Sequence, residues 1–193
     1  MRQIDCQYSD ALDVIWTTTA ARLGFKVSRS TDVFASSDGK GTIILSTSDE
    51  FDPDDSLAQL VFHELCHAIV EGPESWHEKD WGLDNTNDKD IVREHACHRV
   101  QAALSQPFGL RRFFGVTTEW RTYYDALPDD PLEIDSDPAS HIASAAIQRL
   151  KNSSWYTEIE KALSSTARVA EVVQKYSEPN SLWATFEPAA RLD

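Results

Sequence analysis

The sequence predicts an α+β fold in a single domain spanning residues 1–193. Its 193 residues, 41% of them hydrophobic, are enough for one core and too few to presume two. Apolar residues recur at helical spacing in five segments. One further stretch of β-forming residues is interrupted by Asp38-Gly39, which is a tight-turn signal between two strands.

A helix and a hairpin are expected near the N-terminus. Residues 9–23 carry apolar side chains at helical spacing, with Ser9 as the expected N-cap. β-Forming residues occupy 25–36, and a second strand follows the turn at 42–45. The pattern therefore predicts a small antiparallel β-sheet.

The next helix is expected over residues 53–70. Asp52 is a candidate N-cap, and Pro53 suits the first helical position. Asp54 would place a negative charge at the positive end of the helix dipole. Gly72-Pro73 should end this helix, because neither residue favours its continuation.

The second half of the chain is expected to be helical. The helix boundaries indicated by periodicity, caps and prolines are 87–106, 139–151 and 155–176. The first of these should begin near Asn87 and stop at Pro107. We therefore divide the domain into a core, residues 9–107, and a C-terminal helical extension, residues 138–176.

Composition limits the partners and the location. The chain has 18 Lys and Arg against 32 Asp and Glu, a formal net charge of −14, which disfavours nucleic acid and anionic lipid as direct ligands. No apolar run reaches the length of a membrane helix, and residues 1–10 do not resemble a secretory signal. The odd cysteine count (Cys6, Cys66 and Cys97) suits a reducing compartment. We expect a cytoplasmic protein.

The motif that indicates chemistry is His63-Glu64-x-x-His67, within the helix expected over residues 53–70. Residues four apart lie on one helical face, so both imidazoles could bind one zinc ion. Glu64 would lie beside the metal, where its carboxylate could accept a proton from a zinc-bound water. The helix is otherwise apolar, and burying these polar groups would be costly without a metal.

A catalytic zinc ion usually has three protein ligands, so a third must come from elsewhere in the chain. The candidates are His77, in the loop after the motif, and three residues of the next helix: Glu94, His95 and His98. Glu94 and His98 lie one turn apart, so one could bind metal while the other supports it.

The segment from Ser9 to Pro107 resembles the glutamate-zincin (gluzincin) peptidases, and within them the ImmA/IrrE branch. That branch has a helix, a small antiparallel β-sheet, a His-Glu-x-x-His helix and a helix with the third-ligand glutamate. The resemblance makes Glu94 the third ligand. Residues matching the pattern after this glutamate are Cys97, Val100, Leu104 and Pro107. Two positions differ: His98 replaces an amide and Gln101 replaces the usual alanine.

The SprT type of zinc peptidase is also similar around the hairpin and the motif. Its third ligand is a histidine of the following loop, and in this chain His77 could be that ligand. Proteins of this type act on protein bound to DNA, which the acidic composition of this chain disfavours.

The resemblance implies a zincin-like metallopeptidase domain with added C-terminal helices and one Zn²⁺ per chain. It would hydrolyse peptide bonds in a protein or peptide, with Glu64 as general base. The alternative is a zinc-binding regulatory or interaction module without hydrolytic activity. Related enzymes stabilise the oxyanion with a Tyr, His or Arg, for which the candidates are His77, Arg121, Tyr123 and Tyr124. An edge strand at residues 42–46 could pair with an extended substrate.

Overall fold

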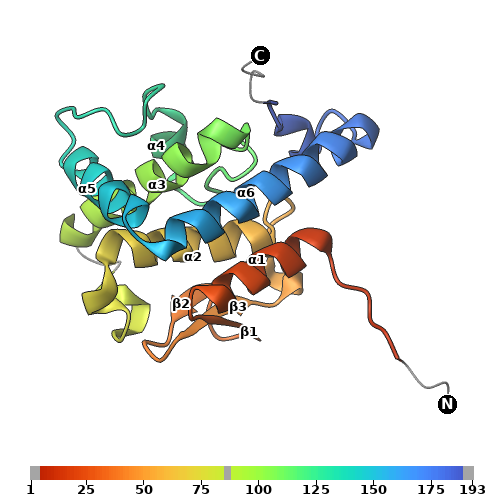
Figure 1. Cartoon of the computed structure of the whole chain (residues 1–193), viewed down its shortest axis with the longest axis horizontal. Helices are drawn as coiled ribbons and strands as arrows, with labels where there is room; N and C mark the ends of the chain where they lie inside the picture. Colours follow the sequence, from red (N-terminus) through yellow and green to blue (C-terminus); the bar gives the residue numbers. More distant parts are fainter. Residues whose placement is uncertain (1–4, 85–87, 189–193) are drawn as a thin grey trace.

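A computed structural model describes residues 5–84 and 88–188 of the chain (Figure 1). Within them it shows an α+β fold of six α-helices and one three-stranded mixed sheet. The α-helices are α1 (Ala11–Arg22), α2 (Leu57–Glu71), α3 (Asp88–Ser105), α4 (Arg121–Asp125), α5 (Ala139–Lys151) and α6 (Ser154–Val173). The strands are β1 (Lys26–Ser30), β2 (Ala35–Ser37) and β3 (Thr42–Ser46). Short 3₁₀ turns include Pro73–Ser75, Lys79–Gly82 and Gln174–Tyr176.

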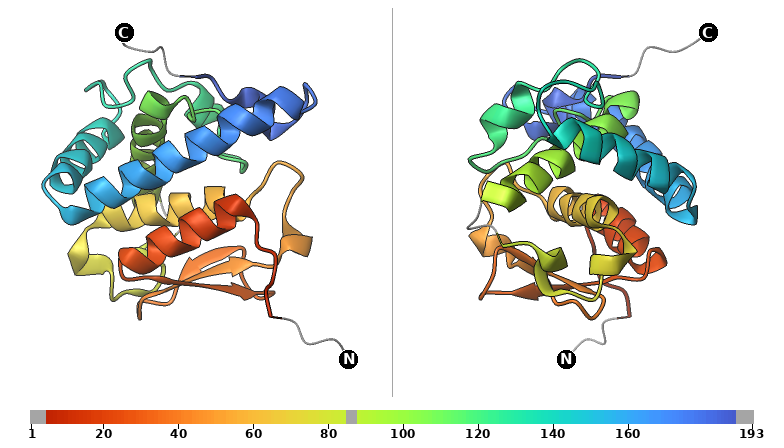
Figure 2. Two further views of the ribbon diagram at one scale, coloured as in Figure 1. Left: turned by 45° about the vertical axis from the view of Figure 1, so that its right-hand side comes forward. Right: turned by 90° about the vertical axis from the view of Figure 1, so that its left-hand side faces the viewer.

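The layers place α2 at the centre of the molecule. Figure 2 shows the sheet at one end, with α1 and then α2 above it and the remaining helices beyond. Helix α2 packs against α1, α3 and α5, and it also contacts β2 and β3. Nearly every residue of α2 is buried, including its two central polar residues Glu64 and His67. None of the helices in the described part of the chain has the length and apolar character that crossing a membrane requires.

The sheet corrects two expectations. Its order is β1-β3-β2, with β3 parallel to β1 and antiparallel to β2, so the sheet is mixed rather than antiparallel. Residues 42–46 form the central strand, so the proposal that they are a free edge is wrong. The physical reason is that Ile43 and Leu45 are fully buried, whereas β1 is mostly exposed and polar, which suits an edge. The hairpin around Asp38-Gly39 is confirmed as β2 and β3.

Two helix starts also differ from expectation. Helix α1 is capped by Asp10, whose carboxylate accepts a hydrogen bond from the Leu12 amide at 2.8 Å, rather than by Ser9. Helix α2 begins at Leu57 with Ser56 as its cap, four residues after Pro53. The aspartates before it close a separate turn, because the Asp52 amide donates to the Asp55 carboxylate at 2.9 Å.

The other boundaries are close to those expected. Helix α3 is described from Asp88, so the expected start at Asn87 lies outside the described residues. Helix α5 matches residues 139–151, whereas α6 ends at Val173 and the 3₁₀ turn Gln174–Tyr176 continues it. Helix α4 was not expected from the sequence.

Trp16 connects the N-terminal helix to the C-terminal extension. Its ring is fully buried between Phe62 of α2, at a centroid distance of 4.8 Å, and Phe114, at 5.3 Å. Its indole nitrogen donates a hydrogen bond of 3.0 Å to the Thr166 hydroxyl of α6. The extension therefore shares one core with the site-bearing helix.

Replacing Trp16 with alanine should lower the free energy of unfolding by about 3–5 kcal/mol, because it leaves a large cavity and a buried hydroxyl without its donor. Urea denaturation followed by circular dichroism measures this change. Val172→Ala is the control, because Val172 is exposed on α6 and its substitution should lower the free energy of unfolding only slightly. A loss below about 1 kcal/mol for Trp16→Ala would contradict this account of the core.

Candidate metal centre

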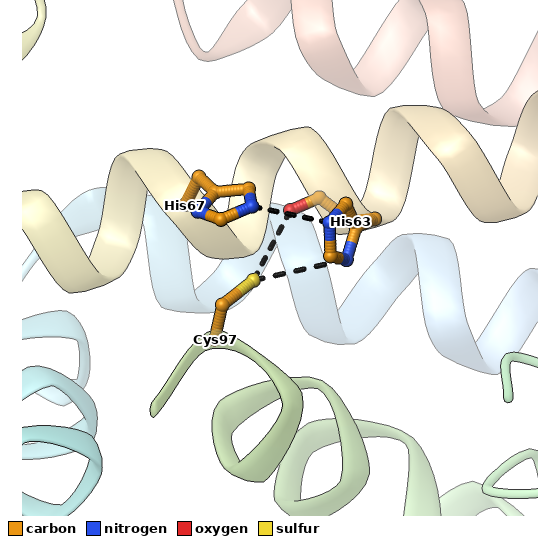
Figure 3. A group of neighbouring side chains, drawn as sticks. All are labelled: His63, His67 and Cys97. Carbon is orange, nitrogen blue, oxygen red and sulfur yellow. Dashed lines mark hydrogen bonds between the residues drawn. The ribbon is translucent and has the colours of Figure 1, made fainter. Parts of the chain in front are cut away.

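Helix α2 brings the two motif histidines together. His63 and His67 are one turn apart, and their Nε2 atoms are 3.1 Å from each other (Figure 3). Their rings are nearly perpendicular, with centroids 4.6 Å apart. His67 is buried and His63 is partly exposed, so both nitrogens lie at the border between the core and the cleft described below.

Helix α3 supplies a carboxylate to the same point. Glu94 Oε1 lies 3.4 Å from His63 Nε2, and Glu94 Oε2 lies 3.2 Å from His67 Nε2. Burial by itself would raise the pKa of Glu94, but the neighbouring imidazoles, first that of His67, lower it well below its ordinary value. Glu94 is therefore an ionised carboxylate at neutral pH.

The separations between these three groups suit a metal ion. Ligands at about 2.0–2.1 Å in tetrahedral directions are about 3.3 Å from one another. The observed separations are 3.1, 3.2 and 3.4 Å. The two imidazole nitrogens are thus spaced as ligands of one small cation, and each oxygen of Glu94 lies beside one of them.

Two overlapping groups in the described residues could hold a metal: His63 with His67 and Cys97, and His63 with Glu94 and His98. Cys97 Sγ lies 3.6 Å from the His63 carbonyl oxygen and 3.8 Å from His63 Nδ1 (Figure 3). Burial raises the pKa of the Cys97 thiol, so it stays protonated and can donate to that carbonyl. Glu94 is ionised without a metal, whereas Cys97 would lose its proton on binding one, as coordinating thiols do.

Gln101 orients His63. Its side-chain oxygen lies 2.9 Å from His63 Nδ1, and its side-chain nitrogen donates to the Phe114 carbonyl oxygen. These two bonds fix the amide, so Nδ1 of His63 donates to Gln101 and Nε2 is the ring nitrogen that faces His67 and Glu94. The sequence identified Gln101 only as a departure from the family pattern. Its position two turns after Glu94, on the same face of α3, was the feature of the sequence that placed it near the site.

His98 supports Glu94 from within α3. It is fully buried, and its Nε2 lies 2.9 Å from Glu94 Oε1. Burial lowers the pKa of His98 to about 4, so the ring is neutral at pH 7. This is the arrangement expected if Glu94 binds the metal while His98 holds the carboxylate.

The structure does not bring the other two ligand candidates to this point. His77 is exposed in the loop between two 3₁₀ turns. The ring of His95 is stacked on Tyr123, with centroids 3.6 Å apart and an interplanar angle of 9°. Neither residue lines the cleft beside the motif.

That cleft has a volume of about 300 Å³ and is lined by His63, Glu64, His67 and Glu94. Phe34 and Ala35, at the start of β2, form part of one wall, and residues 115–120 form another. β2, rather than β3, is the edge strand beside the cleft, and Asp80 already binds the Ser37 amide on its outer edge. The lining thus combines ionisable side chains with apolar ones such as Leu60, Ile91 and Trp120.

Three of the four residues considered as oxyanion donors have other contacts. Tyr123 donates to Asp137 at 2.7 Å, and Tyr124 donates to the Arg111 carbonyl oxygen at 2.8 Å. Arg121 pairs with Asp125 at 2.9 Å. Like His77, these three residues do not line the cleft.

Comparisons with protein-family models, curated proteins and solved structures find no match to this chain. The interpretation of the site therefore depends on its own geometry.

Gln101→Ala should weaken binding of a divalent ion by roughly 10- to 100-fold, because His63 loses the partner that fixes its tautomer and orientation. Titration of the metal-free protein with Zn²⁺ against a competing chelator measures this change. Gln148→Ala, on the exposed face of α5, is the matched control. Unchanged affinity in Gln101→Ala would mean that His63 does not need this amide to bind metal.

Proposed function

We propose that this protein is a zinc-dependent metallopeptidase of the glutamate-zincin type, similar to the ImmA/IrrE branch, with a zincin-like fold. The observation that carries the proposal is that the side chains of His63, His67 and Glu94 converge within 3.4 Å of one another beside Glu64 in an open cleft. Three protein ligands and access from solvent are typical of a catalytic site, whereas a structural site is closed by four.

These three residues would hold one Zn²⁺ per chain. A bound zinc ion would lower the pKa of a water molecule to about 7 and polarise the carbonyl of the scissile peptide bond. Glu64 lines the same cleft and follows His63 directly, so its carboxylate can accept the proton of the attacking water and then pass it to the leaving amine. The cleft beside the edge strand β2 suits an extended protein or peptide segment.

Two other functions are less well supported. A SprT-like peptidase would need His77 as a ligand, but its side chain is exposed and outside the cleft. A regulatory or interaction module that uses zinc only structurally would not need Glu64, yet this carboxylate is kept in a largely apolar helix. We also propose, from composition alone, that the protein acts in the cytoplasm and does not bind nucleic acid directly.

Purified protein should contain about one zinc ion per chain, measured by elemental analysis after zinc supplementation.

Glu94→Gln should weaken zinc binding because it removes a charged ligand. The loss should exceed the roughly 10- to 100-fold that is typical when a ligand loses only its hydrogen-bond partner. Melting temperature should fall with zinc content, since the ion stabilises only the folded state. His77→Ala is the control and should keep its zinc. Full zinc content in Glu94→Gln would exclude Glu94 as the third ligand.

Glu64→Gln should abolish peptide cleavage while zinc content and melting temperature stay near wild type. The amide keeps the shape of the side chain but cannot accept the proton, and general base catalysis typically contributes about 10²- to 10⁴-fold. Cleavage of a library of quenched fluorescent peptides, followed by mass spectrometry of the products, measures the loss. Wild-type cleavage rates in Glu64→Gln would rule out the mechanism in which Glu64 is the general base.

A further inference from the structure

The proposed general base has a buried partner that is not part of the metal centre. The indole nitrogen of Trp81 donates a hydrogen bond of 2.8 Å to Glu64 Oε2. Trp81 is 2% exposed, and its ring packs edge-on against Phe25, with centroids 5.3 Å apart. A donor held this tightly permits little rotation of the carboxylate to which it donates.

The backbone that presents this indole is unusual. Asp80 and Trp81 have φ angles of 50° and 59°, and among the described residues they are the two non-glycine residues with positive φ. Consecutive left-handed residues with side chains are disfavoured sterically, and such conformations persist only when their surroundings enforce them. Strain of this kind is concentrated at functional sites.

The side chain of Asp80 shows what enforces the conformation. Its Oδ1 accepts hydrogen bonds from the Ser36 hydroxyl and from the Ser37 amide, both in the edge strand β2. Gly39, in the hairpin turn that follows β2, lies so close to this loop that a Cβ there would be 2.7 Å from the His77 carbonyl oxygen. Asp80 thus attaches the loop to the strand beside the cleft, and Trp81 attaches the same loop to Glu64.

We infer that Trp81 is a positioning residue for Glu64, an inference that rests on the proposed peptidase function. Its N–H group fixes Oε2 and leaves Oε1 as the oxygen that accepts the proton of the attacking water. Through Asp80, the same two-residue segment sets the position of the base relative to the strand against which a substrate would lie.

Trp81→Phe tests the inference, with Trp76→Phe as a matched control. Trp76 belongs to the same loop and donates at 2.9 Å to the Ala68 carbonyl oxygen, so its variant also loses an indole hydrogen bond, one that is partly buried. Trp81→Phe should lower kcat about 10-fold, which corresponds to the loss of one hydrogen bond to a charged group, with KM and zinc content unchanged. Trp76→Phe should keep kcat. In a Glu64→Gln background, adding Trp81→Phe should not lower kcat any further.

A second measurement does not depend on activity. The six tryptophans give six indole N–H signals in an amide-correlation NMR spectrum. Glu64→Gln should move the Trp81 signal, because the acceptor loses its charge, and should leave the Trp76 signal in place. If Trp81→Phe does not fold, a benzothiophene in place of the Trp81 indole keeps the shape and removes only the donor.

The outcomes separate the two proposals. Two results would overturn the role of Trp81 while leaving the peptidase proposal intact. One is a wild-type kcat in Trp81→Phe or in the benzothiophene variant. The other is a Trp81 indole signal whose chemical shift does not change in Glu64→Gln. Equal losses in Trp81→Phe and Trp76→Phe would also overturn it, since the loss would then reflect the loop and not the base. A zinc-loaded wild-type protein that cleaves no peptide would overturn the proposed function itself.

Discussion

The packing of α3 against α2 is the contact on which the rest of the site depends. Helix α2 crosses the apolar centre of the molecule and carries Glu64 and His67 on its buried surface, with the partly exposed His63 beside them. Burying such groups is costly unless each finds a partner. Most of these partners come from α3, where Glu94, His98 and Gln101 occur at intervals of four and three residues and so share one face.

The opposite side of α3 is fixed by a second set of polar contacts. Arg99 is buried, and its guanidinium pairs with Asp135 at 2.6 Å and donates to the Pro131 carbonyl oxygen at 3.1 Å. Its Nε also donates to the Tyr123 hydroxyl at 3.0 Å. The acidic connection before α5 is thereby attached to α3. Such contacts explain how α3 can hold a buried charge at a fixed distance from α2, because the helix is restrained on both sides.

The two carboxylates of the site are distinguished by their surroundings. Glu94 is placed among imidazoles, and its oxygens are directed at His63 and His67. Glu64, although adjacent to His63 in sequence, is instead held by the indole of Trp81. One carboxylate is therefore suited to binding a cation, and the other is kept beside the cation position, where a base is required. This division is set by which neighbours reach each group, since the two side chains are chemically identical.

The sequence by itself determined most of the helices and the motif. Helical periodicity is a local property, so α1, α5 and most of α3 could be predicted from their own residues, and spacing alone placed His63 and His67 on one face. Strand order could not be predicted in this way, because it depends on which strand buries more apolar surface, and Ile43 and Leu45 place β3 in the centre.

Only the tertiary structure decided which distant residues support the site. His77 is nearer to the motif in sequence than Glu94, yet it is Glu94 that the α2–α3 packing brings within 3.4 Å of both histidines. The spacing of Gln101 from Glu94 indicates only a shared face of α3, and Trp81 has no periodic signal at all, because a hydrogen bond between elements depends on how those elements pack. Sequence spacing fixes neighbours within one helix, whereas contacts between segments are fixed by the shared core.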